Sequence, residues 1–374
     1  MFKIIVLFAG LICNQLLYSI AFASDELVEI AADYEVFFRQ LIAEREYPGA
    51  AFVIVSRDRI LHIGTVGHTT ADKTQPIDKQ TTFRLASVSK TFAAEMVGLL
   101  VEDGTLQWDE PVTRYVPAFK INGDTSQIQI QHLLGQTSGL MPHAYDNLLE
   151  HGKSMETIWK RMSDLSYLCD PGDCYGYQNS LFSLVDPLIE HATTKSFEIL
   201  VEQRLFKPLD MTTASIGYDS FVSNPNHARP HAWRRGKWTT VPVQKNFYRA
   251  APAAGVNASI LDVGKWLQAQ LGNKPDVLSP EMVEYLQIPR IKTRREMYRK
   301  EWKKNLSNAH YGLGWRIYQL GEEELIYHGG WVSGFRADVA FSPKHDIGMA
   351  VLLNAESSGI SKLTLRFWQM ALAL

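Results

Sequence analysis

Ser87 and Lys90 are the first residues of this chain whose types and spacing suggest chemistry. They are three positions apart where a helical pattern is predicted to begin, and side chains at i and i+3 share one helix face. A serine hydroxyl is a weak nucleophile until a base removes its proton. Lysine is such a base only when burial or nearby positive charge lowers its pKa. The pair indicates covalent catalysis, although a lone Ser-x-x-Lys also occurs by chance.

Tyr177 and Asn179 follow a predicted turn at Pro171-Gly172. A tyrosine beside a cationic lysine can transfer protons, and an asparagine amide can both orient a lysine and donate to a substrate carbonyl. Taken alone, the pattern also fits a packed tyrosine and a loop-capping asparagine.

His328, Gly329, Gly330 and Trp331 lie at the end of a predicted strand. Two glycines allow a ligand to approach the backbone closely. The Trp331 amide could then join the Ser87 amide as an oxyanion hole. The alternative is a glycine bulge on an edge strand.

In this order, the three patterns resemble the superfamily of class C β-lactamases and D-Ala-D-Ala carboxypeptidases, over about residues 30–370. Further stretches that resemble it are His132-Leu133-Leu134, Thr137-Ser138-Gly139-Leu140, Phe206-Lys207-Pro208-Leu209, Ala254-Gly255-Val256, Tyr311-Gly312-Leu313-Gly314-Trp315 and Val339-Ala340-Phe341-Ser342-Pro343. The resemblance implies a β-lactamase/transpeptidase-like fold and an acyl-enzyme on Ser87. It also implies proton transfer by Lys90 and Tyr177, and no metal or organic cofactor.

The third pattern departs from class C β-lactamases, which usually have Lys-Thr-Gly there. A histidine is mostly neutral at pH 7, and His-x-Gly resembles D-Ala-D-Ala carboxypeptidases, D-aminopeptidases and some esterases of the superfamily. Arg336 could supply the missing charge as a carboxylate clamp; a surface salt bridge is the alternative.

The sequence therefore leaves three hypotheses about the function. The first is a β-lactamase-like or penicillin-binding enzyme acting on β-lactam or D-Ala-type amide bonds. The second is an esterase or D-aminopeptidase on the same scaffold. The third is a non-catalytic envelope binding protein. The expected partner is a small-molecule or peptidoglycan-derived substrate.

The order of predicted elements favours an α/β (α+β) fold, with an antiparallel sheet flanked by helices and a mostly helical region inserted. We expect the sheet region at about 24–85 and 255–374, and the helical region at about 86–254. Helices are predicted over residues 26–46, 87–102, 260–271 and 361–374, and strands over 50–55, 60–66, 325–327, 337–342 and 347–354.

The N-terminus has the pattern of a secretory signal peptide, with Lys3, an apolar stretch and the Ala21-Phe22-Ala23 cleavage pattern. We expect residues 1–23 to be removed, leaving one domain over residues 24–374 without a stable membrane span; an uncleaved anchor is the alternative. The expected location is periplasmic or secreted. In an oxidising compartment Cys169 and Cys174 are predicted to form a disulfide, with two free thiols as the alternative.

The net charge of −2 does not favour a nucleic-acid partner. One basic stretch, residues 290–304, is interpreted as a solvated helix face, with contact to anionic envelope polymers as the alternative. His143, His231 and His310 lack metal-ligand spacing and are interpreted as structural or surface residues, and no metal site is predicted.

Overall fold

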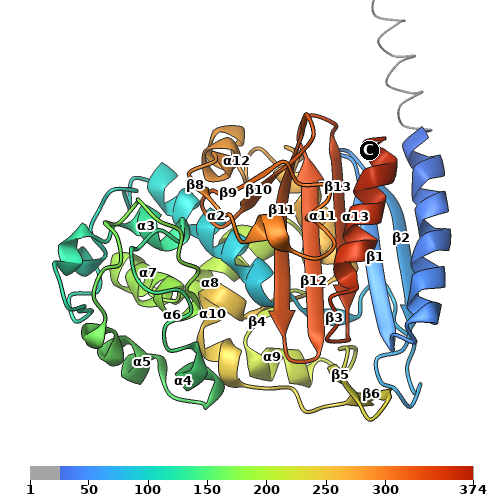
Figure 1. Cartoon of the computed structure of the whole chain (residues 1–374), viewed down its shortest axis with the longest axis horizontal. Coiled ribbons are helices and arrows are strands. Elements are labelled where there is room, and N and C mark those ends of the chain that lie inside the picture. The colour runs from blue at the N-terminus through green and yellow to red at the C-terminus, as the bar shows by residue number, and fades with distance from the viewer. Residues whose placement is uncertain (1–25, 374) are drawn as a thin grey trace, which may run out of the picture.

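An eight-stranded sheet, in which every neighbouring pair is antiparallel, forms the centre of the sheet region (Figure 1). The computed structural model describes residues 26–373. The strand order is β2-β1-β13-β12-β11-β10-β9-β8. In chain order the strands are β1 (Gly49–Val55), β2 (Ile60–Gly67), β8 (Ile291–Lys292), β9 (Asn308–Tyr311), β10 (Arg316–Leu320), β11 (Glu323–Val332), β12 (Phe335–Ser342) and β13 (Ile347–Leu353).

Helices cover both faces of the sheet, which explains why strands β1 and β13 are apolar throughout. All seven residues of β1 and all seven of β13 are buried, as expected for strands between two helical layers. A helix over residues 26–44 and α13 (Ile360–Ala371) pack on one face around Tyr34, Phe52 and Phe367. On the other face, α11 (Ile260–Gln270) contacts β1 and β13, and α2 (Ser89–Glu102) belongs to the same core.

The middle of the chain forms a mostly helical region beside the sheet (Figure 1). Two small sheets also occur: β3 (Thr82–Arg84), β7 (Val256–Ser259) and β4 (Ser215–Ile216) form one, and β5 (His231–Arg234) and β6 (Lys237–Thr240) form the other. The other α-helices are α3 (Ile130–Leu134), α4 (Asp146–Glu150), α5 (Met155–Arg161), α6 (Asn179–Phe182), α7 (Val185–Thr193), α8 (Phe197–Val201), α9 (Tyr218–Ser223), α10 (Ala251–Ala254) and α12 (Pro280–Gln287).

The predicted mixed fold, with its antiparallel sheet and flanking helices, is confirmed. The N-terminal hairpin and helices α11 (Ile260–Gln270) and α13 (Ile360–Ala371) also lie where the patterns placed them. Strands β8, β9 and β10 were not predicted, because each is short and the last two carry mixed polar and apolar residues. The glycine-bulge alternative is wrong: β11 is an interior strand, and its pairing with β12 runs from Ile326–Phe341 to Val332–Phe335 without a register shift.

Two further predictions are decided by the structure. Cys169 and Cys174 form the predicted disulfide. The basic stretch at 290–304 is not a helix face: it contains β8 and a 3₁₀ turn (Glu296–Tyr298), and several of its residues line a cleft. Within residues 26–373, no helix has both the length and the apolar character needed to cross a bilayer.

Candidate active site

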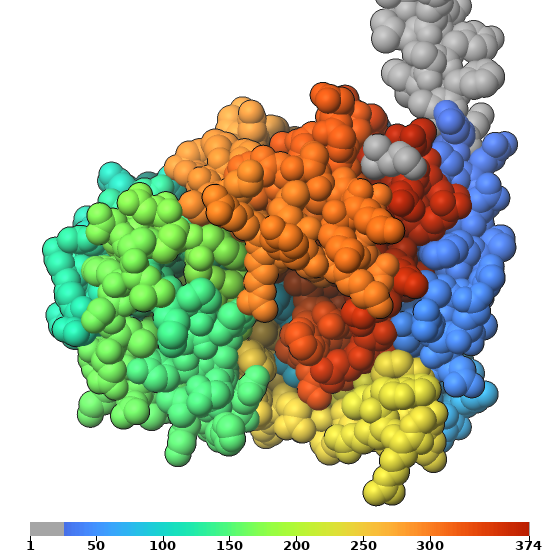
Figure 2. Space-filling view, in the orientation of Figure 1, coloured from blue at the N-terminus to red at the C-terminus, as the bar shows by residue number. Residues whose placement is uncertain are grey.

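A cleft of about 1320 Å³ separates the helical region from the sheet region. In Figure 2 it is the hollow between the green helical part of the chain and the orange and red segments of the C-terminal part. Its lining includes five residues singled out from the sequence, namely Ser87, Tyr177, Asn179, Trp331 and Arg336, and the glycines Gly329 and Gly330. The tertiary structure thus brings the three sequence patterns together.

Ser87 lies in a 3₁₀ turn, Ala86–Val88, between β3 and α2. The predicted helix therefore begins two residues later than expected, at Ser89. Ala86 has a φ of +50°, a left-handed conformation that costs roughly 1–3 kcal/mol for a residue with a side chain. This tight turn directs the Ser87 side chain into the cleft rather than onto a regular helix face.

Lys90 has no exposed surface, and its amine has three oxygen neighbours. Lys90 Nζ is 2.7 Å from Asn179 Oδ1, 3.1 Å from the Ala253 carbonyl oxygen and 3.5 Å from Ser87 Oγ. Burial lowers the pKa of Lys90 and favours the neutral amine. In that form its two N–H groups are donated to Asn179 and Ala253, and its lone pair is left for the Ser87 hydroxyl.

Tyr177 lies against this amine, with the centre of its ring 4.7 Å from Lys90 Nζ. The Tyr177 hydroxyl is buried and has no hydrogen-bond partner within the part of the chain that the structure describes. A buried phenol without a partner is uncommon. Such a hydroxyl is suited to forming its hydrogen bond only when a substrate is bound.

The glycines of β11 bring this strand against the nucleophile turn. A Cβ atom at Gly330 would lie 2.1 Å from the Leu85 carbonyl oxygen and 3.2 Å from Ala86 Cβ, so only glycine fits. Strand β10 pairs with β11 only as far as Tyr327, whereas β12 pairs with it up to Val332. The backbone from residue 328 to 332 therefore has one edge free of strand pairing beside Ser87.

His328 is fully buried and does not face the cleft as the lysine of a Lys-Thr-Gly motif would. Burial, together with the positive charges of Arg316 and Lys90, lowers the pKa of His328 well below its ordinary value. Arg316 donates to Nε2 over 3.1 Å, so we assign the proton of the neutral ring to Nδ1, which lies 3.1 Å from the Gly329 carbonyl oxygen.

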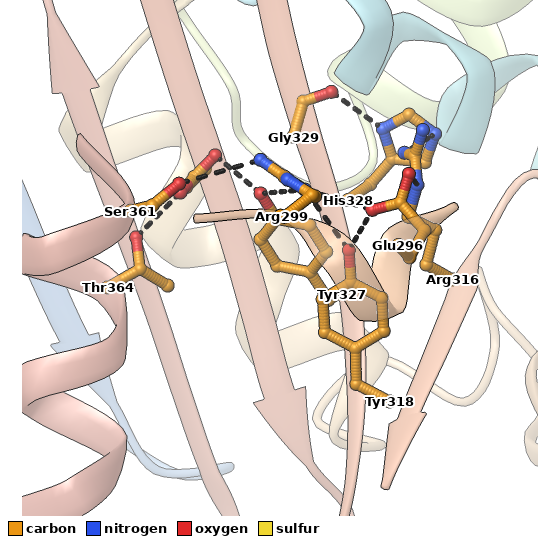
Figure 3. Close-up of polar contacts among 10 residues, drawn as sticks. Glu296, Arg299, Arg316, Tyr318, Tyr327, His328, Gly329, Ser361 and Thr364 are labelled. Atoms are coloured by element: carbon orange, nitrogen blue, oxygen red, sulfur yellow. Dashed lines mark hydrogen bonds and ion pairs between the residues drawn. The ribbon is translucent and has the colours of Figure 1, made fainter. Parts of the chain in front are cut away.

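Arg316, a residue that sequence reasoning missed, is the buried cation nearest to His328. Its guanidinium is 5.4 Å from the centre of the Tyr177 ring, and its Nε is 3.5 Å from Glu296 Oε1. Burial would raise the pKa of Glu296, but Arg316 and Arg299 outweigh it and lower this pKa to about 2. Figure 3 shows the resulting network of Glu296, Arg299, Arg316, Tyr318, Tyr327, His328 and Ser361. Asp338 accepts from both Tyr327 and Thr364 and so extends this network to Thr364.

Arg336 stacks over the Trp331 indole at 4.4 Å and lines the cleft, and the structure shows no ion pair of Arg336 within residues 26–373. This arrangement fits the clamp better than the surface salt-bridge alternative. His143 is not merely a surface residue, because it lines the cleft beside Tyr177. No cluster of metal-ligating side chains occurs among the described residues.

Comparison with known proteins is consistent with this geometry. A family model described as "Beta-lactamase" matches residues 35–368. The chain belongs to the β-lactamase family. A penicillin-binding protein homologue from Pyrococcus abyssi, described as octameric, has the same fold: the TM-score is 0.79 at 22% identity, over 91% of this chain and 77% of that one. The β-lactamase/transpeptidase-like fold expected from the sequence is thereby confirmed.

Relatives of this β-lactamase-family chain include proteins of different names. "Protein flp" of Staphylococcus aureus (strain MRSA252) is 26% identical over 331 residues, covering 84% of this chain and 61% of that protein. "Unguisins hydrolase ungD'" of Aspergillus campestris is 25% identical over 297 residues, covering 75% of this chain and 54% of that protein. This chain thus spans about three fifths of the length of the staphylococcal relative.

Proposed function

We propose that this chain is a serine hydrolase that forms an acyl-enzyme on Ser87. The observation that supports this most strongly is the environment of Lys90. A buried amine with two fixed acceptors, 3.5 Å from a serine hydroxyl in a cleft, is suited to the role of a general base. The name of the Aspergillus relative, a hydrolase, agrees with this reaction class.

In the proposed reaction Ser87 Oγ attacks the substrate carbonyl carbon while Lys90 accepts the hydroxyl proton. Tyr177 then carries a proton to the leaving group. The Ser87 amide and the Trp331 amide, on the free edge of β11, donate to the developing oxyanion. A water molecule activated near Tyr177 attacks the acyl carbon and releases Ser87. Apart from the substrate and the attacking water, every group named in these steps is a side chain or an amide of this chain.

The proposed substrates are β-lactams or D-Ala-type amides, which carry a carboxylate near the scissile bond. Two cations at the cleft fit such a group. Arg336 lines the cleft with its planar face on Trp331, and Arg316 lines it beside Tyr177. Planar guanidinium groups bind carboxylates through paired hydrogen bonds. Asn179 is the proposed contact for the substrate amide.

A second candidate function, hydrolysis of an ester or of a D-amino-acid amide, is favoured by one observation. His328 is buried and neutral where a charged lysine is usual in class C β-lactamases. A neutral side chain at position 328 binds a substrate lacking a carboxylate at lower cost than a lysine would, because no charge at this position is left unpaired.

Export to an oxidising compartment is also part of the proposal. The disulfide between Cys169 and Cys174 supports it, because disulfides persist mainly outside the reducing cytosol. The leader pattern lies outside the described residues and stays a prediction.

The test is mass spectrometry of the purified protein after incubation with benzylpenicillin, beside turnover of nitrocefin and of p-nitrophenyl acetate. An adduct on Ser87 or nitrocefin turnover supports the penicillin-recognising function. Ester turnover without an adduct supports the second candidate. The Ser87→Ala variant is expected to abolish every activity. Undiminished activity in that variant, or no reaction with any probe, would overturn the hydrolase proposal.

A further inference from the structure

Asp146, at the start of α4, joins two groups of the candidate site. Its Oδ2 accepts from Asn179 Nδ2 over 2.8 Å and lies 2.9 Å from His143 Nδ1. The Asp146 side chain is only 13% exposed. Because Asn179 in turn accepts from Lys90, a continuous chain of hydrogen bonds runs from the buried lysine to a histidine in the cleft.

The donor and acceptor of each of these hydrogen bonds follow from the chemistry of Asp146 and Lys90 at the two ends of the series. An ionised carboxylate can only accept hydrogen bonds, so Asp146 requires the NH₂ group of the Asn179 amide to point toward it. The carbonyl oxygen of the amide must then point toward Lys90. With the opposite orientation the amide NH₂ would face Lys90 Nζ, and it would compete with the Ser87 hydroxyl for the lone pair of the neutral amine.

Asp146 also holds His143 beside Tyr177. The two ring centres are 5.5 Å apart, and the His143 amide donates to the Tyr177 carbonyl oxygen over 2.8 Å. His143 and Tyr145 both have left-handed backbones, with φ of +56° and +61°. Two such residues beside one cleft-facing carboxylate indicate that the segment is held in this shape by its contacts.

We propose that Asp146 is a positioning residue of the site, which acts by fixing the Asn179 amide so that Lys90 directs its lone pair at Ser87. The inference rests on the proposed function, since it assigns Lys90 the role of base. Asp146 does not touch the reacting atoms. Its effect is therefore expected on the chemical step rather than on substrate binding.

A purely structural role for Asp146 makes a different prediction. A carboxylate in the first turn of a helix stabilises that helix through its dipole, and any residue that suits a helix start would serve equally well. The Asp146→Ser variant separates the two roles. Serine is accepted at helix starts, but it both donates and accepts hydrogen bonds, and it is too short to hold the Asn179 amide.

The experiment measures kcat and KM for nitrocefin and for p-nitrophenyl acetate. The variants are Asp146→Asn, Asp146→Ser, Asn179→Ala and the double variant Asp146→Asn/Asn179→Ala. We expect both Asp146 variants to lose about tenfold to 100-fold in kcat, as for a small misplacement of reacting groups, with KM nearly unchanged. Because Asp146 acts through Asn179, the double variant should be no slower than Asn179→Ala. Asp164→Asn, on an exposed residue paired with Arg161, is the matched control and should equal the wild type.

Wild-type kcat in the Asp146 variants would overturn the inference, and so would losses that multiply in the double variant. The same holds if Asp146→Ser retains full activity while Asp146→Asn does not fold. These outcomes differ from a failure of the proposed function, which the Ser87→Ala variant reports independently.

Discussion

At the scale of single residues, the decisive feature is the number of acceptors around Lys90. Asn179 Oδ1 and the Ala253 carbonyl oxygen accept the two N–H groups of the neutral amine, and Ser87 Oγ faces its lone pair. Burial, the largest influence on this residue, favours the same neutral form. In the proposed reaction the pair acts as nucleophile and base, and this role depends on the fold, which brings helix α10 and residue Asn179 to Lys90.

Replacing Lys90 with methionine tests this assignment. Methionine has a similar length and no base, so kcat/KM should fall by about 10²–10⁴, the usual contribution of general acid–base catalysis. Folding should be retained, because removing an amine from a buried site removes a desolvation cost. Steady-state kinetics and thermal unfolding check both parts; activity within a few-fold of the wild type would exclude Lys90 as the base.

His328 yields a prediction about pH. Its pKa lies well below the ordinary histidine value because of burial and the charges of Arg316 and Lys90, so the ring stays neutral in the range around neutral pH. The pH profile of kcat/KM should therefore show no limb that belongs to His328 in this range. The profile of His328→Gln should have the same midpoints as the wild type, even where its rate is lower. A limb near neutral pH that disappears in the variant would show that His328 titrates during the reaction.

At the scale of elements, the site depends on how closely β11 approaches the turn that carries Ser87. Strand β10 ends its pairing at Tyr327, so the next residues of β11 have a free backbone edge. The turn fills this position and contacts β11 directly. A shift of either element would separate the two amides of the proposed oxyanion hole.

Gly330→Ala tests this packing. The new Cβ would lie 2.1 Å from a backbone oxygen of Leu85, so β11 or the turn must move. We expect a loss of about 100-fold in kcat/KM, the scale of a 1 Å misplacement, from a protein that still folds. Gly321→Ala is a suitable control because a Cβ there meets no atom within 4 Å, although its φ of +60° adds some strain. Equal activities in the two variants would contradict the proposed role of this contact.

At the scale of the whole molecule, the buried network in Figure 3 ties the segment around Glu296 to the sheet and to α13. Arg299 contacts Glu296, Tyr318, Tyr327 and Ser361. Because this segment also lines the cleft, the network that stabilises the sheet fixes one wall of the site.

The network predicts a specific loss of stability in acid. The pKa of Glu296 is lowered from 4.5 to about 2 in the folded protein. A carboxyl whose pKa is lower in the folded state stabilises the fold at pH values above its unfolded-state pKa. This stabilisation, about 3 kcal/mol, is lost as the pH falls from about 4.5 to about 2. Glu296→Gln should destabilise the protein by roughly 3–5 kcal/mol at pH 7, because two arginines lose their carboxylate.

Urea unfolding at pH 7 and pH 3 measures both effects. The difference between wild type and Glu296→Gln should be large at pH 7 and smaller at pH 3. An equal difference at the two pH values would show that the carboxylate charge is not what stabilises this network.

The sequence alone determined the residues with local signatures. Ser87 and Lys90 share one short segment, the two cysteines flank a turn, and the terminal elements have clear periodicity, so each could be predicted from neighbours along the chain. Only the tertiary structure decided what surrounds them. Asp146, Arg316 and Glu296 carry no motif. Asp146 hydrogen bonds to Asn179 from another segment of the chain, and Arg316 contacts His328 and Glu296 from a neighbouring strand. Burial and the number of hydrogen-bond partners are properties of space rather than of sequence, so the neutral His328 and the orientation of the Asn179 amide became visible only in the fold.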